Sequence, residues 1–252
     1  MINKKMSRLT QVEKDKIIKL ASKGHSLNQI SQLTNRPKSI IHYYSQELLV
    51  HKTTTPKFNF SDEELGEFMG IFAGDGGFYF DKKLYKYTIG IYTGFLDSDY
   101  KEKQINLFKK IFSKKPQCYT KNNDHVYVIR YYSKDIYNLI KKYLDWNGKK
   151  TYSIKLKDML NNPKEFNIGF LRGLFDTDGS YYRPKKRISY GTVSKELHSQ
   201  TLSLLRSLGF EPKYHISNPK DKSRFYSVVL HGEQSNKFIK LIKPRNTSKL
   251  IR

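Results

Sequence analysis

The sequence predicts an α+β protein in which two αββαββα repeats, related by pseudo-twofold symmetry, follow a small all-α domain. Three observations lead to this fold class. A glycine-bearing segment at residues 65–76, LGEFMGIFAGDG, recurs as IGFLRGLFDTDG at residues 168–179. The same order of strand-like and helix-like segments follows each copy. Before the first copy, residues 9–49 show helical periodicity alone. With 252 residues, 37% of them hydrophobic, the chain can bury a sizeable core.

Residues 1–50 are expected to form the all-α domain. Apolar residues such as Val12 and Ile17 recur at roughly helical spacing over residues 10–23, and Gly24 ends that helix. Ser26 caps a second helix, and a break at Pro37 separates it from a third. The pattern resembles the helix-turn-helix domains of resolvases and transposases, in which early residues of the last helix meet base edges. A three-helix bundle that only packs on a neighbour has the same spacing. The residues that would read bases are Lys38, Ser39, His42 and Tyr43.

A threonine run and a proline predict a linker over residues 51–60. The first repeat is then expected over residues 61–150 and the second over residues 151–252. Each opens with the glycine-bearing segment as a helix. In the first repeat the elements that follow are strands near 77–82, 85–93, 116–121 and 125–132, with helices over 97–112 and 133–144. In the second they are strands near 180–183, 187–193, 210–216 and 224–231, a helix over 194–208 and a last helix ending near Lys243.

Charge and cysteine content bound the function. The formal net charge is +24, and the basic residues run along the whole chain, which indicates a polyanionic partner on an extended surface. A solubility adaptation, or an AT-rich genome that favours lysine codons, is the alternative reading. A single cysteine, Cys118, excludes a disulfide framework and a cysteine-built zinc cluster. Because no apolar run reaches the length of a membrane span, we expect a soluble intracellular protein, cytoplasmic or organellar and not secreted.

The repeated segment predicts two helices in direct contact. Glycine costs about 1 kcal/mol relative to alanine inside a helix, so matched glycines four residues apart indicate that two backbones approach closely. An aspartate followed by glycine ends each helix, and two parallel helices would bring Asp75 and Asp178 together. A single Asp-Gly pair is more often a simple turn, but two matched copies in a basic chain favour a site. The packing residues are Gly66, Gly70, Gly169 and Gly173.

Paired carboxylates suit a divalent cation. With the backbone carbonyls of Gly74 and Thr177 they would form an all-oxygen site of the kind that Mg²⁺ prefers. Against a DNA backbone, such ions can lower the pKa of an attacking water and neutralise a leaving oxygen. The sequence therefore predicts phosphodiester hydrolysis at Asp75 and Asp178, with one acid serving each strand.

These residues resemble those of a known family. LRGLFDTDG at 171–179 closely resembles the nine-residue signature of the LAGLIDADG homing endonucleases, and FMGIFAGDG at 68–76 is a looser match. The resemblance covers residues 61–252. It implies two antiparallel sheets laid along the DNA major groove, and cleavage of both strands at a long asymmetric site. It also implies two or three Mg²⁺ ions at the helix ends, with Ca²⁺ supporting binding without cleavage. The first copy departs at Ala73, where the second has Asp176, but the metal-binding acid of the family is the last one, which both copies keep.

The resemblance further implies a lysine beside each metal site. KKTYSIKLKDML at 149–160 offers Lys155 first and Lys150 second, and KPRNTSKL at 243–250 offers Lys249. For each of them a solvated or phosphate-contacting side chain is the alternative. Strand alternation gives the residues that would face DNA, subject to a register error of one residue. They are Lys86, Thr88, Tyr92, Arg130, Arg187 and Ser189.

The interpretation that follows is a site-specific, Mg²⁺-dependent double-strand DNA endonuclease, active as a monomer because one chain supplies both half-sites. Two alternatives stay open on the same scaffold. One is a catalytically silent DNA-binding regulator, and the other is an RNA-binding intron splicing factor. Retention of both Asp75 and Asp178 favours the endonuclease.

Overall fold

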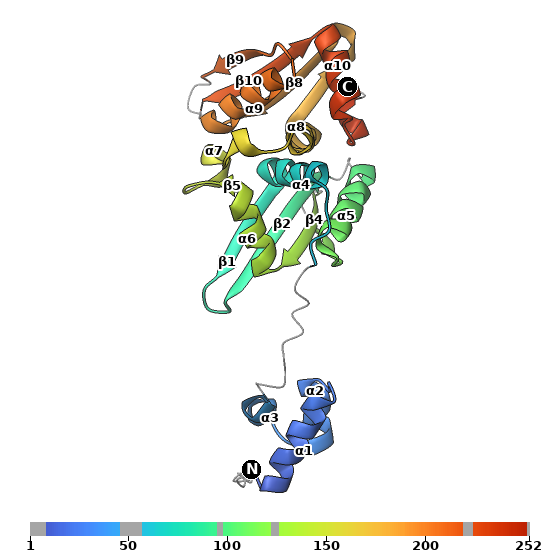
Figure 1. Ribbon diagram of the computed structural model, residues 1–252, viewed down its shortest axis with the longest axis vertical. Helices are drawn as coiled ribbons and strands as arrows, with labels where there is room; N and C mark the ends of the chain where they lie inside the picture. Colours follow the sequence, from blue (N-terminus) through green and yellow to red (C-terminus); the bar gives the residue numbers. More distant parts are fainter. Residues whose placement is uncertain (1–8, 46–56, 95–97, 122–125, 219–223, 251–252) are drawn as a thin grey trace. The chain divides into compact units, whose positions relative to one another are not determined.

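A computed structural model divides the chain into two compact units, residues 1–55 and 56–252 (Figure 1). The structure describes residues 9–45, 57–94, 98–121, 126–218 and 224–250. Residues 51–56 of the expected linker, and Asp97 at the expected start of a helix, lie outside those ranges. Among the described helices, none is long and apolar enough to cross a membrane.

The first unit holds three short helices, α1 (Gln11–Ser22), α2 (Leu27–Thr34) and α3 (Lys38–Ser45). Thr10 and Ser26 cap the first two, each accepting a hydrogen bond from the third backbone N–H of its helix. Such a cap contributes about 1 kcal/mol. Val12 and Leu33 belong to the apolar spacing of the sequence, but they are 77% and 53% exposed because they lie on outer helix faces. The core consists instead of Ile17, Ala21, Ile30 and Ile41.

The second unit contains two αββαββα repeats, which confirms the predicted α+β architecture. The elements of the first are α4 (Asp62–Asp75), β1 (Gly76–Asp81), β2 (Lys86–Gly94), α5 (Ser98–Phe112), β3 (Gln117–Lys121), β4 (Val126–Tyr132) and α6 (Lys134–Tyr143). The elements of the second are α8 (Lys164–Asp178), β7 (Gly179–Tyr182), β8 (Arg187–Thr192), α9 (Lys195–Ser207), β9 (Lys213–Ser217), β10 (Phe225–His231) and α10 (Glu233–Ile242).

Several short elements were not predicted from the sequence. They are β5 (Leu144–Asp145), α7 (Lys150–Ser153), β6 (Lys155–Leu156), and the 3₁₀ turns η2 (Met159–Asn161), η3 (Arg183–Lys185) and η4 (Thr247–Leu250). Each is too short to show a helical or strand period in the sequence. They matter for function because α7, β6 and η4 carry the three lysines that the sequence proposed.

Each repeat forms one antiparallel four-stranded sheet. The strand orders are β1-β2-β4-β3 and β7-β8-β10-β9, and the registers correspond, with Gly76 opposite Ile91 and Gly179 opposite Tyr190. Along β2, Ile89 and Ile91 are buried under the helices, whereas Tyr92 is exposed. The opposite face of the sheet, which we call the outer face, is therefore not covered by the helices of its own repeat.

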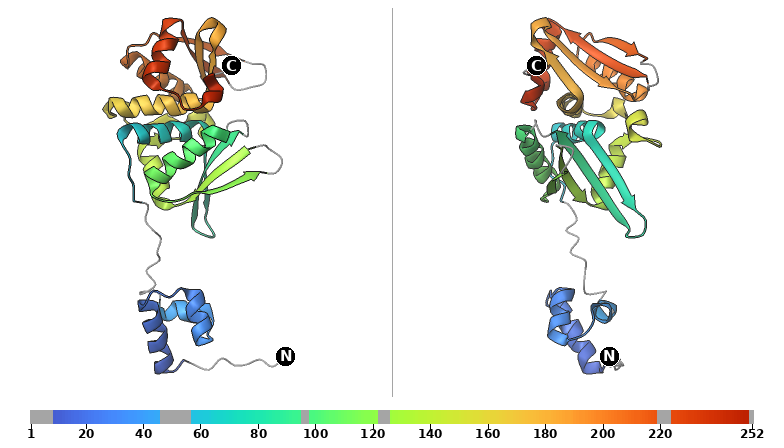
Figure 2. Two further views of the ribbon diagram at one scale, coloured as in Figure 1. Left: turned by 90° about the vertical axis from the view of Figure 1, so that its right-hand side faces the viewer. Right: turned by 180° about the vertical axis from the view of Figure 1, so that it is seen from behind.

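The two motif helices α4 and α8 lie side by side between the two sheets (Figures 1 and 2). Aromatic side chains fill the core on either side of them. The ring of Phe68 meets those of Phe108 and Phe112 edge to face, at centroid distances of 5.3 and 5.0 Å. In the second repeat, Phe175 packs against Phe238 with ring centroids 5.3 Å apart. Aromatic packing of this kind holds each motif helix against another helix of its own repeat.

The buried His198 is expected to make the stability of the second repeat depend on pH. Its ring packs on Tyr226 at 5.2 Å, and burial lowers its pKa below 6.5, although a hydrogen bond with the Ser227 backbone partly opposes this. A lowered pKa favours the neutral form in the folded state. Stability is therefore full above about pH 6.5 and is lost as the pH falls through that value toward the lower folded pKa. As the pH is lowered from 8 to 5, the melting temperature should fall more steeply for the wild type than for His198→Phe. Equal slopes of melting temperature against pH would contradict this.

Candidate active site

The helices α4 and α8 pack in parallel with their backbones in contact. A methyl group added to Gly70 would overlap the Phe170 carbonyl oxygen, and one added to Gly173 would overlap the Glu67 carbonyl oxygen. Gly66 and Gly169 face main-chain oxygens of the opposite helix in the same way. The four repeated glycines therefore do what the sequence predicts of them. Parallel packing means that both helices end at the same place.

That shared end brings the two motif acids together. A Cβ added to Gly74 would meet the hydroxyl of Thr177 and lie 2.8 Å from Oδ2 of Asp178, so the end of α4 is in close contact with this carboxylate. Asp75 is half-buried, and Asp178 is exposed. Nevertheless, the protein packed around the Asp178 carboxylate raises its pKa, while Lys249, Lys150 and Thr177 oppose that rise.

Lys150 is the amine that reaches the first motif helix. From α7, its Nζ donates to the carbonyl oxygens of Phe72, Ala73 and Gly74 at 2.8, 2.7 and 3.2 Å. These are among the last carbonyls of α4, where the helix presents negative partial charge. Burial lowers the pKa of Lys150 to about 8, against the opposing charges of Asp178 and Asp75.

The order of the two lysine candidates is thus reversed relative to the sequence. Lys155 lies on β6 with an exposed side chain, and its residue pairs with Asp145 of β5. Lys150, the second choice, makes the contacts with the motif helix. On the other side of the site, η4 carries Lys249. Its positive charge is the largest of the influences that lower the pKa of Asp178. Each acid therefore has a lysine in its surroundings.

The donor set fits a hard divalent cation. Among the described residues, no group of three or more His, Cys, Asp or Glu side chains gathers that could hold a metal. A cation at this point would be held by the carboxylates of Asp75 and Asp178 with main-chain oxygens, a set that suits Mg²⁺. The Gly74 carbonyl already accepts a long hydrogen bond from Lys150. The Thr177 hydroxyl donates inside α8, so its carbonyl is the group to consider, as predicted.

Comparison with known proteins agrees with this geometry. The family model of the LAGLIDADG-like domain matches residues 165–243. The chain carries a LAGLIDADG-like domain. Structures of the homing endonuclease I-DmoI superpose with a TM-score of 0.55 at 20% identity, covering 72% of this chain and 95% of that one. The homing endonuclease I-WcaI, solved bound to its DNA recognition sequence, superposes with a TM-score of 0.53 at 16% identity, covering 77% and 88%. At this identity the likeness shows the fold.

Curated relatives match over much of this chain. The chain is 30% identical over 195 residues to the replication factor C small subunit of Methanocaldococcus jannaschii. The alignment covers 73% of this chain and 10% of that protein. The chain is 26% identical over 197 residues to a DNA polymerase of Thermococcus sp. strain GE8, with 74% of this chain and 11% of that protein. The chain therefore spans about a tenth of the length of the curated relatives it matches.

The outer face of the first LAGLIDADG-like repeat carries alternating cations and tyrosines. Lys86, Thr88, Tyr92 and Arg130 line one hollow on this face, so the predicted alternation has the right register. The Lys86 Nζ lies 3.7 Å from the centroid of the Tyr132 ring, and the Arg130 guanidinium lies 4.7 Å from that of Tyr119. Sequence reasoning missed Tyr119 and Tyr132, which the same alternation extended to β3 and β4 would have found.

The outer face of the second repeat differs in chemistry. Arg187 and Ser189 lie on it, in register with His231 and Val229 of β10. Matched through the paired registers, Val229 occupies the place that Arg130 has in the first repeat. Phe225 lies over Gly191, where an added Cβ would collide with its ring. The two outer faces are therefore unlike in chemistry.

In the first unit, Ile41 of α3 points into the core, and the residues expected to read bases, Lys38, Ser39, His42 and Tyr43, are all exposed.

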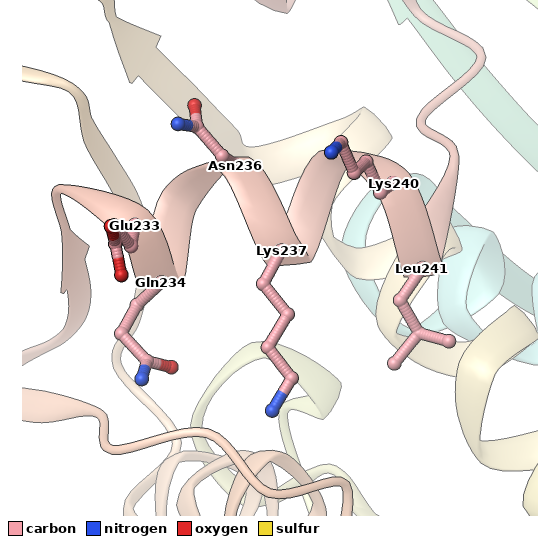
Figure 3. A pocket seen from close by; sticks show the side chains of 6 residues that line it. All are labelled: Glu233, Gln234, Asn236, Lys237, Lys240 and Leu241. Atoms are coloured by element: carbon pink, nitrogen blue, oxygen red, sulfur yellow. The ribbon is translucent and has the colours of Figure 1, made fainter.

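A shallow hollow lies along α10, between Glu233 and Leu241 (Figure 3). Its side chains leave one helix in different directions, and Lys237 is already bound to the Gly209 carbonyl at 2.5 Å. The α10 hollow therefore does not gather the groups of a site.

Proposed function

We propose that this protein is a site-specific double-strand DNA endonuclease of the homing type, which hydrolyses phosphodiester bonds with Mg²⁺ held at Asp75 and Asp178. The observation that carries the proposal is the meeting of two carboxylates at the ends of two glycine-packed parallel helices. A net charge of +24 around them suits a phosphate backbone. Because one chain supplies both acids, the active form is a monomer, and a stable dimer in light scattering would contradict this.

The residues divide the work as follows. Asp75 and Asp178, with nearby main-chain oxygens, would hold the cation, which when bound lowers the pKa of water and neutralises a leaving oxygen. Lys150 holds the end of α4 and adds positive charge beside both acids. Lys249 adds positive charge beside Asp178. Positive groups fixed at this point would stabilise the charge that develops on a phosphate during hydrolysis.

Double-stranded DNA is the proposed partner, lying along the two outer faces. Similar folds give support: I-DmoI has been solved with DNA and Mn or Ca, and I-WcaI with its recognition sequence. On the first face, Arg130 and Lys86 can meet base edges or phosphates from a layer of tyrosines. On the second face, Arg187 and Ser189 would take these roles. The long asymmetric site follows from the unlike chemistry of the two faces.

The test is cleavage of a randomised double-stranded DNA library in Mg²⁺, with binding selected in parallel in Ca²⁺. Enrichment of double-strand cuts at one sequence, matched by the sequence selected in Ca²⁺, supports the endonuclease. Selective binding without cutting in Mg²⁺ or Mn²⁺ would instead identify a DNA-binding regulator. Preference for folded RNA over every duplex would identify a splicing factor.

Lys150→Met is expected to slow cleavage by about a hundredfold, the usual loss when one group stabilising transition-state charge is removed. The substitution removes three hydrogen bonds to the end of α4 and the positive charge of the lysine beside Asp178 and Asp75. Lys155→Met, on the exposed side of β6, is expected to cut at nearly the wild-type rate. Single-turnover cleavage of the selected target measures both. A larger loss in Lys155→Met would restore the order that the sequence suggested.

The N-terminal unit is proposed to act as a helix-turn-helix domain that adds contacts beyond the central site. Lys38→Ala combined with Tyr43→Ala is expected to weaken binding to a long target by roughly tenfold and to leave binding to a target trimmed to the central site unchanged. Fluorescence anisotropy in Ca²⁺ measures both affinities. Because both side chains are exposed, folding should not change. Equal affinity of wild type and variant for the long target would contradict the assignment.

A further inference from the structure

Asp176, the acid that the first motif lacks, fastens the chain segment that follows α10. Its side chain is buried, and its two carboxylate oxygens each accept a hydrogen bond from the backbone N–H of Arg245 at 3.0 Å. One of them also accepts from the backbone N–H of Asn246 at 3.0 Å. The buried amide of Asn246 donates in return to the Asp176 carbonyl at 2.9 Å. Four hydrogen bonds therefore join residues 245 and 246 to the end of α8.

The first repeat holds the same segment from the other side. Glu67 of α4 pairs with the Arg245 guanidinium at 3.1 Å, and Lys103 of α5 donates to the Arg245 carbonyl at 2.8 Å. Arg172 of α8 pairs with Glu67 and donates to the Ile242 carbonyl at 2.6 Å. We call this set of contacts on residues 242–246 the clamp. It is built largely from buried charged groups, which are kept in place only when they are fully paired.

The clamp leads directly into η4, which carries Lys249. Asn246 accepts a hydrogen bond from the backbone N–H of Ser248 at 3.2 Å through its side chain, and one from that of Lys249 at 3.2 Å through its carbonyl. These bonds shape η4, which the Arg183 side chain also holds by donating to the Leu250 carbonyl at 3.0 Å. The position of Lys249 therefore depends on Asn246, and through it on Asp176.

The first half of the site is built in a different way. Ala73 stands where the second motif has Asp176, so the same set of hydrogen bonds has no acceptor there. Lys150 bonds directly to the last carbonyls of α4 instead. One lysine is thus held by the motif helix itself, and the other is held through a clamp that includes both repeats.

We propose that Asp176 is a positioning residue that, through Arg245 and Asn246, sets Lys249 beside Asp178, so that cleavage of one DNA strand depends on the clamp and cleavage of the other does not. The proposal rests on the proposed function. A displaced charge of this kind lowers a rate by roughly tenfold to a hundredfold, because electrostatic stabilisation requires the group to be in place beforehand.

The test compares strand cleavage in Asp176→Ala, Lys249→Ala and the double variant, with each strand of the selected target labelled separately. Both single variants are expected to slow the same strand by at least about tenfold, to leave the other strand unchanged and to accumulate nicked DNA. The double variant is expected to be no slower than the slower single variant, because the two residues act through one group. Equal slowing of both strands, or additive losses in the double variant, would overturn the proposal.

Asn246→Ser provides a milder change should Asp176→Ala not fold, since it leaves the carboxylate with its main-chain donors. It is expected to slow the same strand by a smaller factor. A slowed opposite strand would count against the clamp.

A second measurement needs no cleavage and separates the two proposals. Lysines are dimethylated with ¹³C-formaldehyde and a borane reductant in the metal-free protein, and the NMR signal of Lys249 is identified by its loss in Lys249→Arg. Asp178→Asn is expected to shift that signal in an otherwise wild-type chain and to leave it unmoved in Asp176→Ala. A shift that persists in Asp176→Ala overturns the positioning role. If no DNA is cut, the proposed function fails, and this measurement alone decides the clamp.

Discussion

Asp178→Asn is expected to abolish double-strand cleavage, lowering the rate by about a thousandfold or more, while DNA binding in Ca²⁺ is retained. Asparagine has nearly the same shape, so it fits against Gly74 without a shift of either helix. The amide, however, lacks the negative charge that holds a divalent cation. Asp75→Asn should behave in the same way, because Asp75 ends the matching helix. Single-turnover cleavage and mobility-shift binding on the selected target measure the two effects.

Asp145→Asn is the matched control for these acids. Asp145 pairs with Lys141 at 2.8 Å, so its substitution removes a charge of the same kind that belongs to neither motif helix. It is expected to cut at the wild-type rate. If Asp178→Asn cuts as fast as Asp145→Asn does, Asp178 is not a metal ligand and the proposed mechanism fails. If Asp178→Asn neither binds nor cuts, a circular dichroism melt tells whether folding was lost instead.

Local periodicity explains why so much of the fold could be predicted. The strands and helices of both repeats begin and end within a few residues of the predicted ranges, because each is long enough to show its own period. The glycines of the motif helices were informative for the same reason: close backbone contact requires them at a spacing of four. Alternation along the sequence also predicted which face of β2 is buried, since Ile89 and Ile91 are buried and Tyr92 is not.

What could not be predicted depends on contacts between distant residues. Lys150 reaches Phe72, which lies 78 residues before it, from a helix of one turn that has no periodic signal. The resemblance to the family favours Lys155 over Lys150, but the residues around Lys155 carry no information on which amine contacts the end of α4. Asp176 stood out only as a difference from Ala73, and its bonds to Arg245 and Asn246 cross about 70 residues of sequence.

Gly70→Ala tests the helix pair on which the whole site depends, and two effects of opposite sign compete in it. Alanine favours an exposed helix by about 1 kcal/mol relative to glycine. Here the added methyl group would overlap the Phe170 carbonyl oxygen and crowd the backbone of Leu174 and Gly173, which cannot rotate away as a side chain can. Overpacking of a rigid contact costs about 1–3 kcal/mol or more. Crowding on the α8 backbone should therefore win.

The expected result for Gly70→Ala is a melting temperature lower by several degrees, since 1 kcal/mol corresponds to about 2–4 °C in a protein of this size. Cleavage should fall further than stability alone explains, because helices pushed apart at Gly70 also separate Asp75 from Asp178. Asn236→Ala, on the exposed side of α10, is the control in which alanine should leave the melting temperature unchanged or raise it. A Gly70→Ala protein that melts at or above the wild-type temperature would mean that α4 and α8 are not in backbone contact in solution. The site built from the ends of those two helices would then lose its basis.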